Sequence, residues 1–219
     1  VDAFEELANL NCRALSTGGE YLFVGLEVAP WGKLFRRNGN NFEFVANTPE
    51  LLSVVVDSDI SPGGNYLIVS SSNRVVLYEI IDNSIVELLT ITTSSVAVGF
   101  SPSGERFFIA TGSSSGNGYL RIYKQEGQTY SLEFTHSKIG YYGMVASAAF
   151  VSDNSLVLLD GSSTSSLPRW YYLRRLEYNM DTGNWDETLS MELGRFETGD
   201  KLDCFAGKYI LLSGSRALW

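Results

Sequence analysis

The chain has 219 residues, of which 44% are hydrophobic and 19% are charged, and its formal net charge is −9. A chain of this size and composition can bury a sizeable core, and we predict a single domain over residues 1–219. The acidic balance argues against a nucleic-acid partner and against an anionic membrane, because both attract clustered Lys and Arg.

The N-terminal sequence VDAFEELANL carries acids where a secretion signal carries basic residues followed by an apolar core. No stretch of the sequence comes near the roughly 18 consecutive apolar residues that a membrane-spanning helix needs. We therefore expect synthesis without a secretion signal and a cytoplasmic location. Two cysteines, Cys12 and Cys204, are too few for a disulfide scaffold, and we expect both to be free thiols.

In chain order, the predicted elements are short apolar runs that follow similar turns. These turns are STGGEYLFV (16–24), SPGGNYLIV (61–69), SPSGERFFI (101–109), VSDNSLVLL (151–159) and AGKYILL (206–212). The clearest unit is 60–100, with β-branched and aromatic runs at 66–69, 75–78, 85–89 and 96–100. Such runs, cut by Gly, Ser, Asn and Pro about every ten residues, are typical of successive antiparallel strands. The sequence predicts repeated four-stranded units.

Two positions recur in these units. The turn position holds Gly19, Gly64, Gly104, Asn154 and Gly207, which are residue types that accept the left-handed backbone of a tight hairpin. The predicted outermost strand carries an apolar-Glu-apolar pattern with Glu43, Glu87, Glu133 and Glu192. We expect these glutamates to be exposed charges that deter edge-to-edge aggregation.

The order of strands and turns resembles the WD40-like β-propeller repeat, and VAVGFSPSGERFFIATGSSSGNGYLRIYK (96–124) is the most similar stretch. Tyr78-Glu79 and Tyr123-Lys124 stand where that family has Trp-Asp, and no Gly-His pair precedes a unit. The resemblance implies an all-β fold, a β-propeller of four-stranded antiparallel blades.

The ends of the chain indicate the number of blades. Four complete units precede residues 201–219, which supply three more predicted strands, and residues 4–7 carry the missing outer-strand pattern. We predict five blades closed by this N-terminal outer strand. Six or seven blades remain open if the chain is a fragment.

The candidates for chemistry are few. The only histidine, His136, lies in FTHSKIG, and we expect a solvated or capped loop side chain, because no hydrolase signature surrounds any serine. One His with two distant Cys gives no metal-ligand spacing. Asp57 and Asp59 share one face of a predicted strand, but no calcium loop follows them. We expect no catalytic residues, no metal site and no cofactor.

Aromatic residues in loops give the candidate binding face. In the geometry of the resembled family, the relevant loops open on one side of the propeller. They hold Trp31, Tyr141, Tyr142, Arg169, Trp170 and Phe196. Exposed aromatics with Arg are typical of interface hot spots and sugar-stacking sites. The alternative is that several of them fold inward and fill the blades.

We therefore predict a non-enzymatic, structural or protein-binding β-propeller, as a component of a virus or phage particle. Its partners would be other proteins within a larger assembly, and the protein itself would be incorporated into the virion. The alternative function is a lectin-like, carbohydrate-binding propeller. A repeated glycan site should repeat its aromatic and acidic residues in every blade, and this sequence does not do so.

Overall fold

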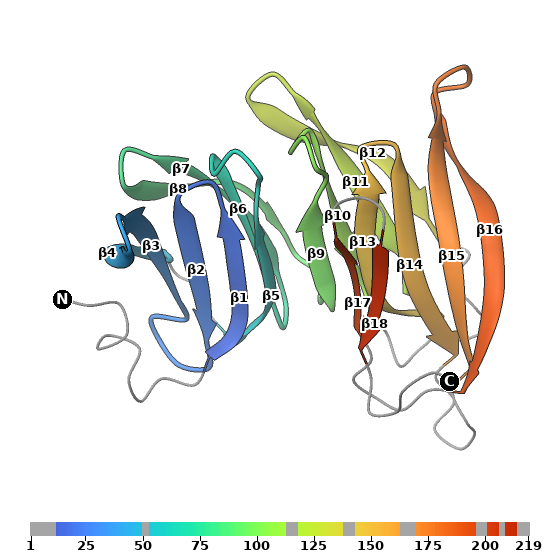
Figure 1. Ribbon diagram of the computed structural model, residues 1–219, viewed down its shortest axis with the longest axis horizontal. Coiled ribbons are helices and arrows are strands. Elements are labelled where there is room, and N and C mark those ends of the chain that lie inside the picture. The colour runs from blue at the N-terminus through green and yellow to red at the C-terminus, as the bar shows by residue number, and fades with distance from the viewer. Residues whose placement is uncertain are drawn as a thin grey trace. The chain divides into compact units, whose positions relative to one another are not determined.

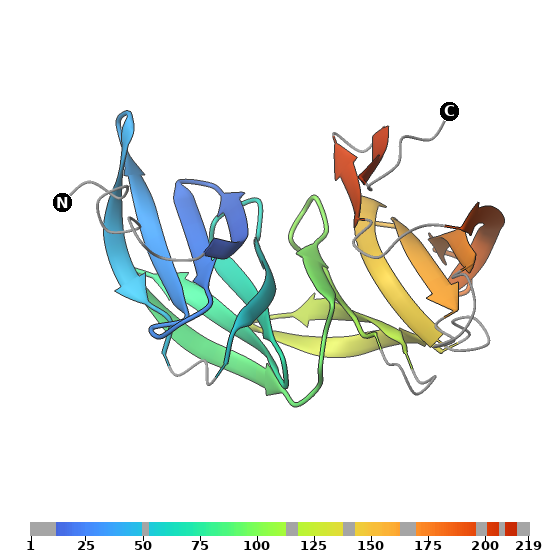
Figure 2. The ribbon, with the colours of Figure 1, turned by 90° about the horizontal axis from the view of Figure 1, so that it is seen from below.

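A computed structural model describes residues 12–49, 53–112, 118–137, 143–162, 170–195, 201–205 and 209–213. All regular elements within these ranges are β-strands (Figures 1 and 2). Among the described residues, no helix is long and apolar enough to cross a membrane. The strands fall into two compact units that divide at Gly104. The expectation of a single domain stays a prediction.

The first unit contains two antiparallel four-stranded sheets and one further strand. The first sheet has the order β1 (Cys12–Gly18), β2 (Tyr21–Leu26), β3 (Gly32–Asn38), β4 (Asn41–Asn47). The second sheet has the order β5 (Val55–Ile60), β6 (Tyr66–Ser71), β7 (Val75–Ile81), β8 (Ser84–Ile91). Strand β9 (Ala97–Phe100) follows them and is the last strand before the division.

The second unit continues the same plan. The third sheet consists of β12 (Thr129–His136), β11 (Leu120–Glu126), β10 (Arg106–Ala110) and β9, in that order. The fourth sheet has the order β13 (Gly143–Ser152), β14 (Ser155–Ser162), β15 (Trp170–Asn179), β16 (Asn184–Arg195). Strands β17 (Lys201–Phe205) and β18 (Tyr209–Ser213) form a two-stranded sheet.

The four runs predicted in the unit 60–100 correspond to strands β6 to β9, whereas the hydrogen-bonded sheet consists of β5 to β8. The last run, 96–100, corresponds to β9, which pairs into the third sheet, while β5 completes the second. Four-stranded antiparallel sheets are confirmed. Residues 4–7 and 214–219 lie outside the described residues, so closure of a fifth blade by the N-terminal strand stays a prediction.

Burial follows each strand's place in its sheet. Every residue of β10 is buried, whereas the outer strand β8 is largely exposed. Side chains of the first and second sheets, among them Phe23, Leu34, Val69 and Tyr78, share one core. Apolar residues on both faces of an inner strand are removed from water, which is the main stabilising contribution.

The turn glycines have the predicted backbone in the three turns where glycine is described. Gly19, Gly64 and Gly104 have φ values of 57°, 76° and 79°. Asn154 differs, because it is not among the described residues with positive φ. In that turn Ser152 pairs directly with Ser155, so the fourth copy uses a shorter connection than the six residues between Ile60 and Leu67.

Candidate functional site

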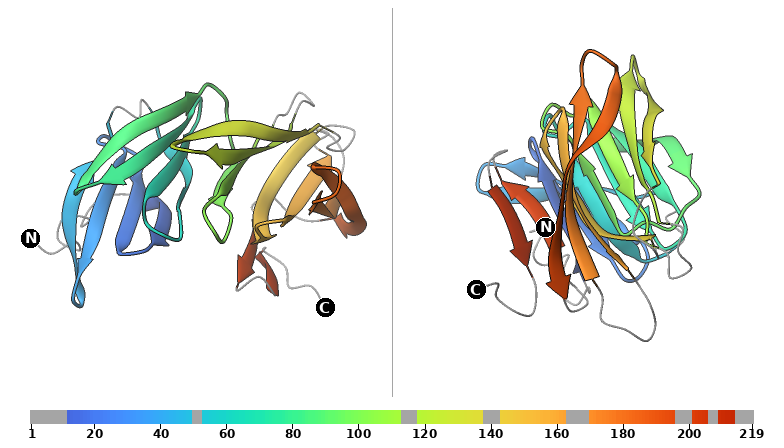
Figure 3. Two further views of the ribbon diagram at one scale, coloured as in Figure 1. Left: turned by 90° about the horizontal axis from the view of Figure 1, so that it is seen from above. Right: turned by 90° about the vertical axis from the view of Figure 1, so that its right-hand side faces the viewer.

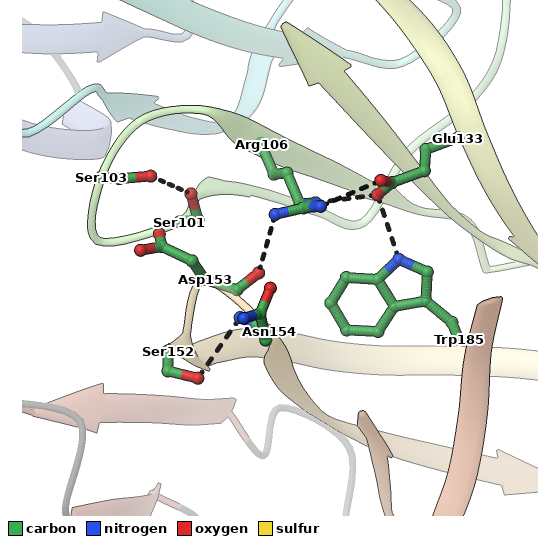
Figure 4. Close-up of polar contacts among 8 residues, drawn as sticks. All are labelled: Ser101, Ser103, Arg106, Glu133, Ser152, Asp153, Asn154 and Trp185. Carbon is green, nitrogen blue, oxygen red and sulfur yellow. Dashed lines mark hydrogen bonds and ion pairs between the residues drawn. The ribbon is translucent and has the colours of Figure 1, made fainter. Parts of the chain in front are cut away.

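A buried ion pair of the third sheet is hydrogen-bonded to the fourth sheet within the second unit (Figure 4). The Arg106 guanidinium, at the start of β10, donates to both carboxylate oxygens of Glu133 on β12, over 2.8 and 3.0 Å. The indole Nε1 of Trp185, on β16, donates to the same carboxylate over 3.0 Å. Arg106 also donates to the carbonyl oxygen of Asp153 over 3.3 Å. We call these four residues the Arg106 clamp.

Aromatic rings surround the charge of the Arg106 clamp. The guanidinium carbon lies 4.9 Å from the ring centroid of Tyr178 and 5.9 Å from that of Trp185. These two rings pack against each other with centroids 5.7 Å apart. Arg106 is 4% exposed and Trp185 is 5% exposed. The cation therefore lies against π-faces in a largely desolvated place, where such contacts are strongest.

The electrostatics keep this pair ionised at neutral pH. Hydrogen bonding and the nearby charge of Glu133 raise the pKa of Arg106, although burial opposes them. Burial raises the pKa of Glu133, but hydrogen bonds from Arg106 and Trp185, with the Arg106 charge, outweigh it and lower the pKa. A carboxylate with these partners acts as a structural anchor, because its lone pairs are already used.

A second ionic group lies on the fourth sheet and includes one residue of the third. Arg174 on β15 donates to Asp160 over 2.7 Å and to Glu187 over 2.8 Å. The Nε2 atom of His136, at the end of β12, is 3.8 Å from Glu187. Asp160 is fully buried. Burial lowers the pKa of Arg174, but its two acidic partners outweigh this effect and the net direction is upward.

The position of His136 differs from the expected one. The sequence suggested a solvated or capped loop residue, but His136 ends a strand and is buried near Glu187. The sequence did not indicate this contact, because Glu187 lies far along the chain from His136.

Asp57 and Asp59 lie on one face of β5, as predicted, and bind backbone. The amide of Val98 donates to Asp57 over 3.0 Å, and the amide of Phe100 donates to Asp59 over 2.8 Å. These carboxylates therefore link β5 to β9. Among the described residues, no group of three or more His, Cys, Asp or Glu is arranged to hold a metal ion.

Of the predicted loop face, the structure places two members. Trp31 has a positive φ of 69°, is half-buried and packs against the core of the first unit. Trp170 begins β15, and its side chain lies outside the described part. Tyr141, Tyr142, Arg169 and Phe196 also lie outside the described residues, so the loop face stays a prediction.

The outer-strand glutamates do not behave alike. Glu43, Glu87 and Glu192 are exposed, as expected for charges on outer strands. The same expectation is wrong for Glu133, whose side chain is 13% exposed and belongs to the Arg106 clamp. Sequence reasoning missed Arg106 and Trp185. The available signal was an arginine at 106 where the two preceding turns have Tyr21 and Tyr66.

Exposed apolar side chains recur on the outer strands. Each four-stranded sheet has at least one on its outermost strand. They are Phe44 on β4, Val86 and Leu88 on β8, Leu132 on β12, and Leu189 and Met191 on β16. We call these six residues the outer-strand apolar set.

The chain matches no family model and no curated protein. It is similar to the solved β-propeller domain of Swd1 from Myceliophteria thermophila, with a TM-score of 0.60, 11% identity, and coverage of 94% of this chain and 80% of that one. It is also similar to Sqt1 from Saccharomyces cerevisiae, with a TM-score of 0.58, 10% identity, and coverage of 83% and 62%.

A third similar structure is a putative 6-phosphogluconolactonase from Bacteroides uniformis, with a TM-score of 0.61 and 14% identity. Coverage is 86% of this chain and 57% of that one. The chain thus spans less than two thirds of the length of the last two proteins. These comparisons, with the four antiparallel four-stranded sheets, show that the chain has a β-propeller fold.

Proposed function

We propose that the protein is a non-enzymatic, protein-binding β-propeller of the WD40-like type. The observation that supports this most directly is the outer-strand apolar set. Its members recur on the outermost strand of each four-stranded sheet, at 38% to 51% exposure. Recurrence at equivalent places distinguishes them from scattered exposed residues, which need no explanation.

The second sheet illustrates the chemistry. Val86 and Leu88 flank Glu87 in the sequence of β8, and both side chains are exposed, at 46% and 38%. Covering their exposed surface with a partner would contribute about 25 cal/mol per Å² of apolar area. Glu87 would remain in water at the rim, where a screened charge contributes little.

The polar groups support a binding role over an enzymatic one. The described charged side chains that are most buried, Arg106 and Asp160, form ion pairs with Glu133 and Arg174, each within one sheet. The fold does not decide the matter, because one of the similar structures is titled a putative lactonase and folds host many functions. Incorporation into a virion, a glycan site and a cytoplasmic location stay predictions.

The test is affinity capture from an extract of the source cells, followed by measurement with the purified pair. Val86→Ser with Leu88→Ser should weaken binding about thirtyfold or more, as expected for desolvated interface residues. The matched control is Glu87→Gln on the same strand, which should bind like the wild type. Failure of the wild-type protein to capture any protein above a tag-only control would contradict the proposal.

A further inference from the structure

The hairpin of β15 and β16 differs from the hairpins that connect the outermost strand to its neighbour in the other three four-stranded sheets. In those, two residues separate the directly paired ends, which are Asn38 with Asn41, Ile81 with Ser84, and Glu126 with Thr129. In the fourth, Asn179 pairs with Asn184, so four residues form the loop. Within the second unit, this hairpin extends past the ends of β13 and β14 (Figures 1 and 3). We call residues 179–184 the β15–β16 tip.

The β15–β16 tip is internally hydrogen-bonded. The side-chain oxygen of Asn179 accepts from the amides of Asp181 and Thr182 over 3.0 and 3.3 Å, and its carbonyl oxygen accepts from Gly183 over 2.8 Å. Gly183 has a φ of 69°, which glycine adopts without steric cost. A loop whose own side chain satisfies its amides is held in one conformation, so binding orders little more of it.

The Arg106 clamp holds the root of this hairpin. Tyr178 and Trp185 pair across β15 and β16 immediately below the tip, and both rings lie against the Arg106 guanidinium. Trp185 also donates to Glu133. The hairpin is therefore fixed to the neighbouring sheet at its base, and the tip projects from a rigid support.

The tip presents an apolar side chain in an acidic setting. Met180 is 74% exposed, more than any other large apolar residue among those described. Asp181, next in the sequence, is exposed, and so is Asp186, which accepts a hydrogen bond from the Asn179 side chain over 3.4 Å. No Lys or Arg occurs in the sequence between residues 176 and 194. The corresponding two-residue loops are Gly39-Asn40, Asp82-Asn83 and Gly127-Gln128, and none of them contains an apolar residue.

We propose that the β15–β16 tip is a docking finger, whose Met180 enters an apolar pocket rimmed by Lys or Arg on another protein. Methionine is flexible and polarisable, and it fills irregular apolar pockets well. Asp181 and Asp186 select a basic rim by charge complementarity, and the same charges repel nucleic acid and anionic lipid. This inference rests on the proposed protein-binding function and adds one hairpin tip to the contact surface of the outer-strand apolar set.

The first experiment places the photocrosslinker p-benzoylphenylalanine at position 180 and, as a matched control, at position 82 in the tip of the β7–β8 hairpin. Both proteins are irradiated in an extract of the source cells, and the crosslinked protein is identified by mass spectrometry. We expect a defined product from position 180 and none of the same mass from position 82.

The second experiment measures affinity with the purified pair. Met180→Ser should weaken binding about thirtyfold, and Asp181→Asn with Asp186→Asn should slow association in low salt. Leu15→Ser, at a 65% exposed apolar residue of β1 outside the outer-strand apolar set, should leave the affinity unchanged. Urea unfolding of Met180→Ser should match the wild type, because the side chain is exposed.

The outcomes separate this inference from the proposed function. If the wild-type protein captures a partner whose affinity Met180→Ser leaves unchanged, the finger is refuted and protein binding stands. If no variant crosslinks and the wild type captures no protein, both are refuted. Equal loss of affinity in Leu15→Ser and Met180→Ser would also overturn the assignment of a contact to this hairpin tip.

Discussion

The Arg106 clamp gives the most demanding prediction, because the expected cost follows from its geometry. Glu133→Ala would leave the Arg106 charge buried without its bidentate partner and would remove the acceptor of the Trp185 indole. Breaking a buried ion pair from one side costs about 3–5 kcal/mol. Since the Glu133 side chain is still 13% exposed, we expect a cost at the lower end of this range, about 3 kcal/mol.

The assay is urea unfolding followed by tryptophan fluorescence. The matched control is Glu87→Ala, the counterpart on β8, which is exposed and accepts a hydrogen bond from the Thr90 hydroxyl over 2.8 Å. It should change the free energy of unfolding by less than about 0.5 kcal/mol. Replacing both partners, as Arg106→Met with Glu133→Leu, should cost less than Glu133→Ala alone, because no charge is left buried.

The pH dependence has a definite sign. The pKa of Glu133 is lowered from its ordinary value of 4.5, so the unfolded chain binds this proton more readily than the folded one. The stabilisation is therefore present above pH 4.5 and is lost as the pH falls through the lowered pKa. The difference in free energy of unfolding between the wild type and Glu133→Ala should therefore become smaller in acid. If Glu133→Ala and Glu87→Ala cost the same at neutral pH, the clamp does not stabilise the fold.

Three further predictions concern the first unit and the chain ends. Tyr78→Phe should cost about 1 kcal/mol in urea unfolding, because it removes only the hydrogen bond from the hydroxyl to the Pro49 carbonyl oxygen. Burial raises the pKa of Tyr78, so alkaline difference spectra of the folded protein should show no phenolate from this residue. Asp59→Ala should cost about 1–3 kcal/mol, because it removes the carboxylate that accepts from the Phe100 amide of β9. Asp59→Asn should cost less, because its side-chain oxygen can still accept this hydrogen bond. Removing residues 1–7 should promote self-association in sedimentation, and an unchanged monomer would refute the N-terminal closing strand.

Much of the fold follows from local sequence chemistry. The apolar runs predicted at 66–69 and 75–78 lie within β6 and β7, because β-branched and aromatic residues favour strands wherever turn residues bound them. Gly64 and Gly104 have the predicted left-handed backbone, since that requirement depends on the turn alone. It was also predictable that Asp57 and Asp59 share one face of β5, because side chains alternate along a strand.

Contacts between residues far apart in the chain were decided only by the tertiary structure. The pattern around Glu133 matches that of Glu87, yet only Glu133 meets an arginine and a tryptophan from other strands. Asp57 and Asp59 bind β9 amides 41 residues away, which no local motif indicates. The sequence pattern specifies which residue faces a neighbouring sheet, but the packing of that sheet determines whether the residue meets water, a charge or a backbone amide.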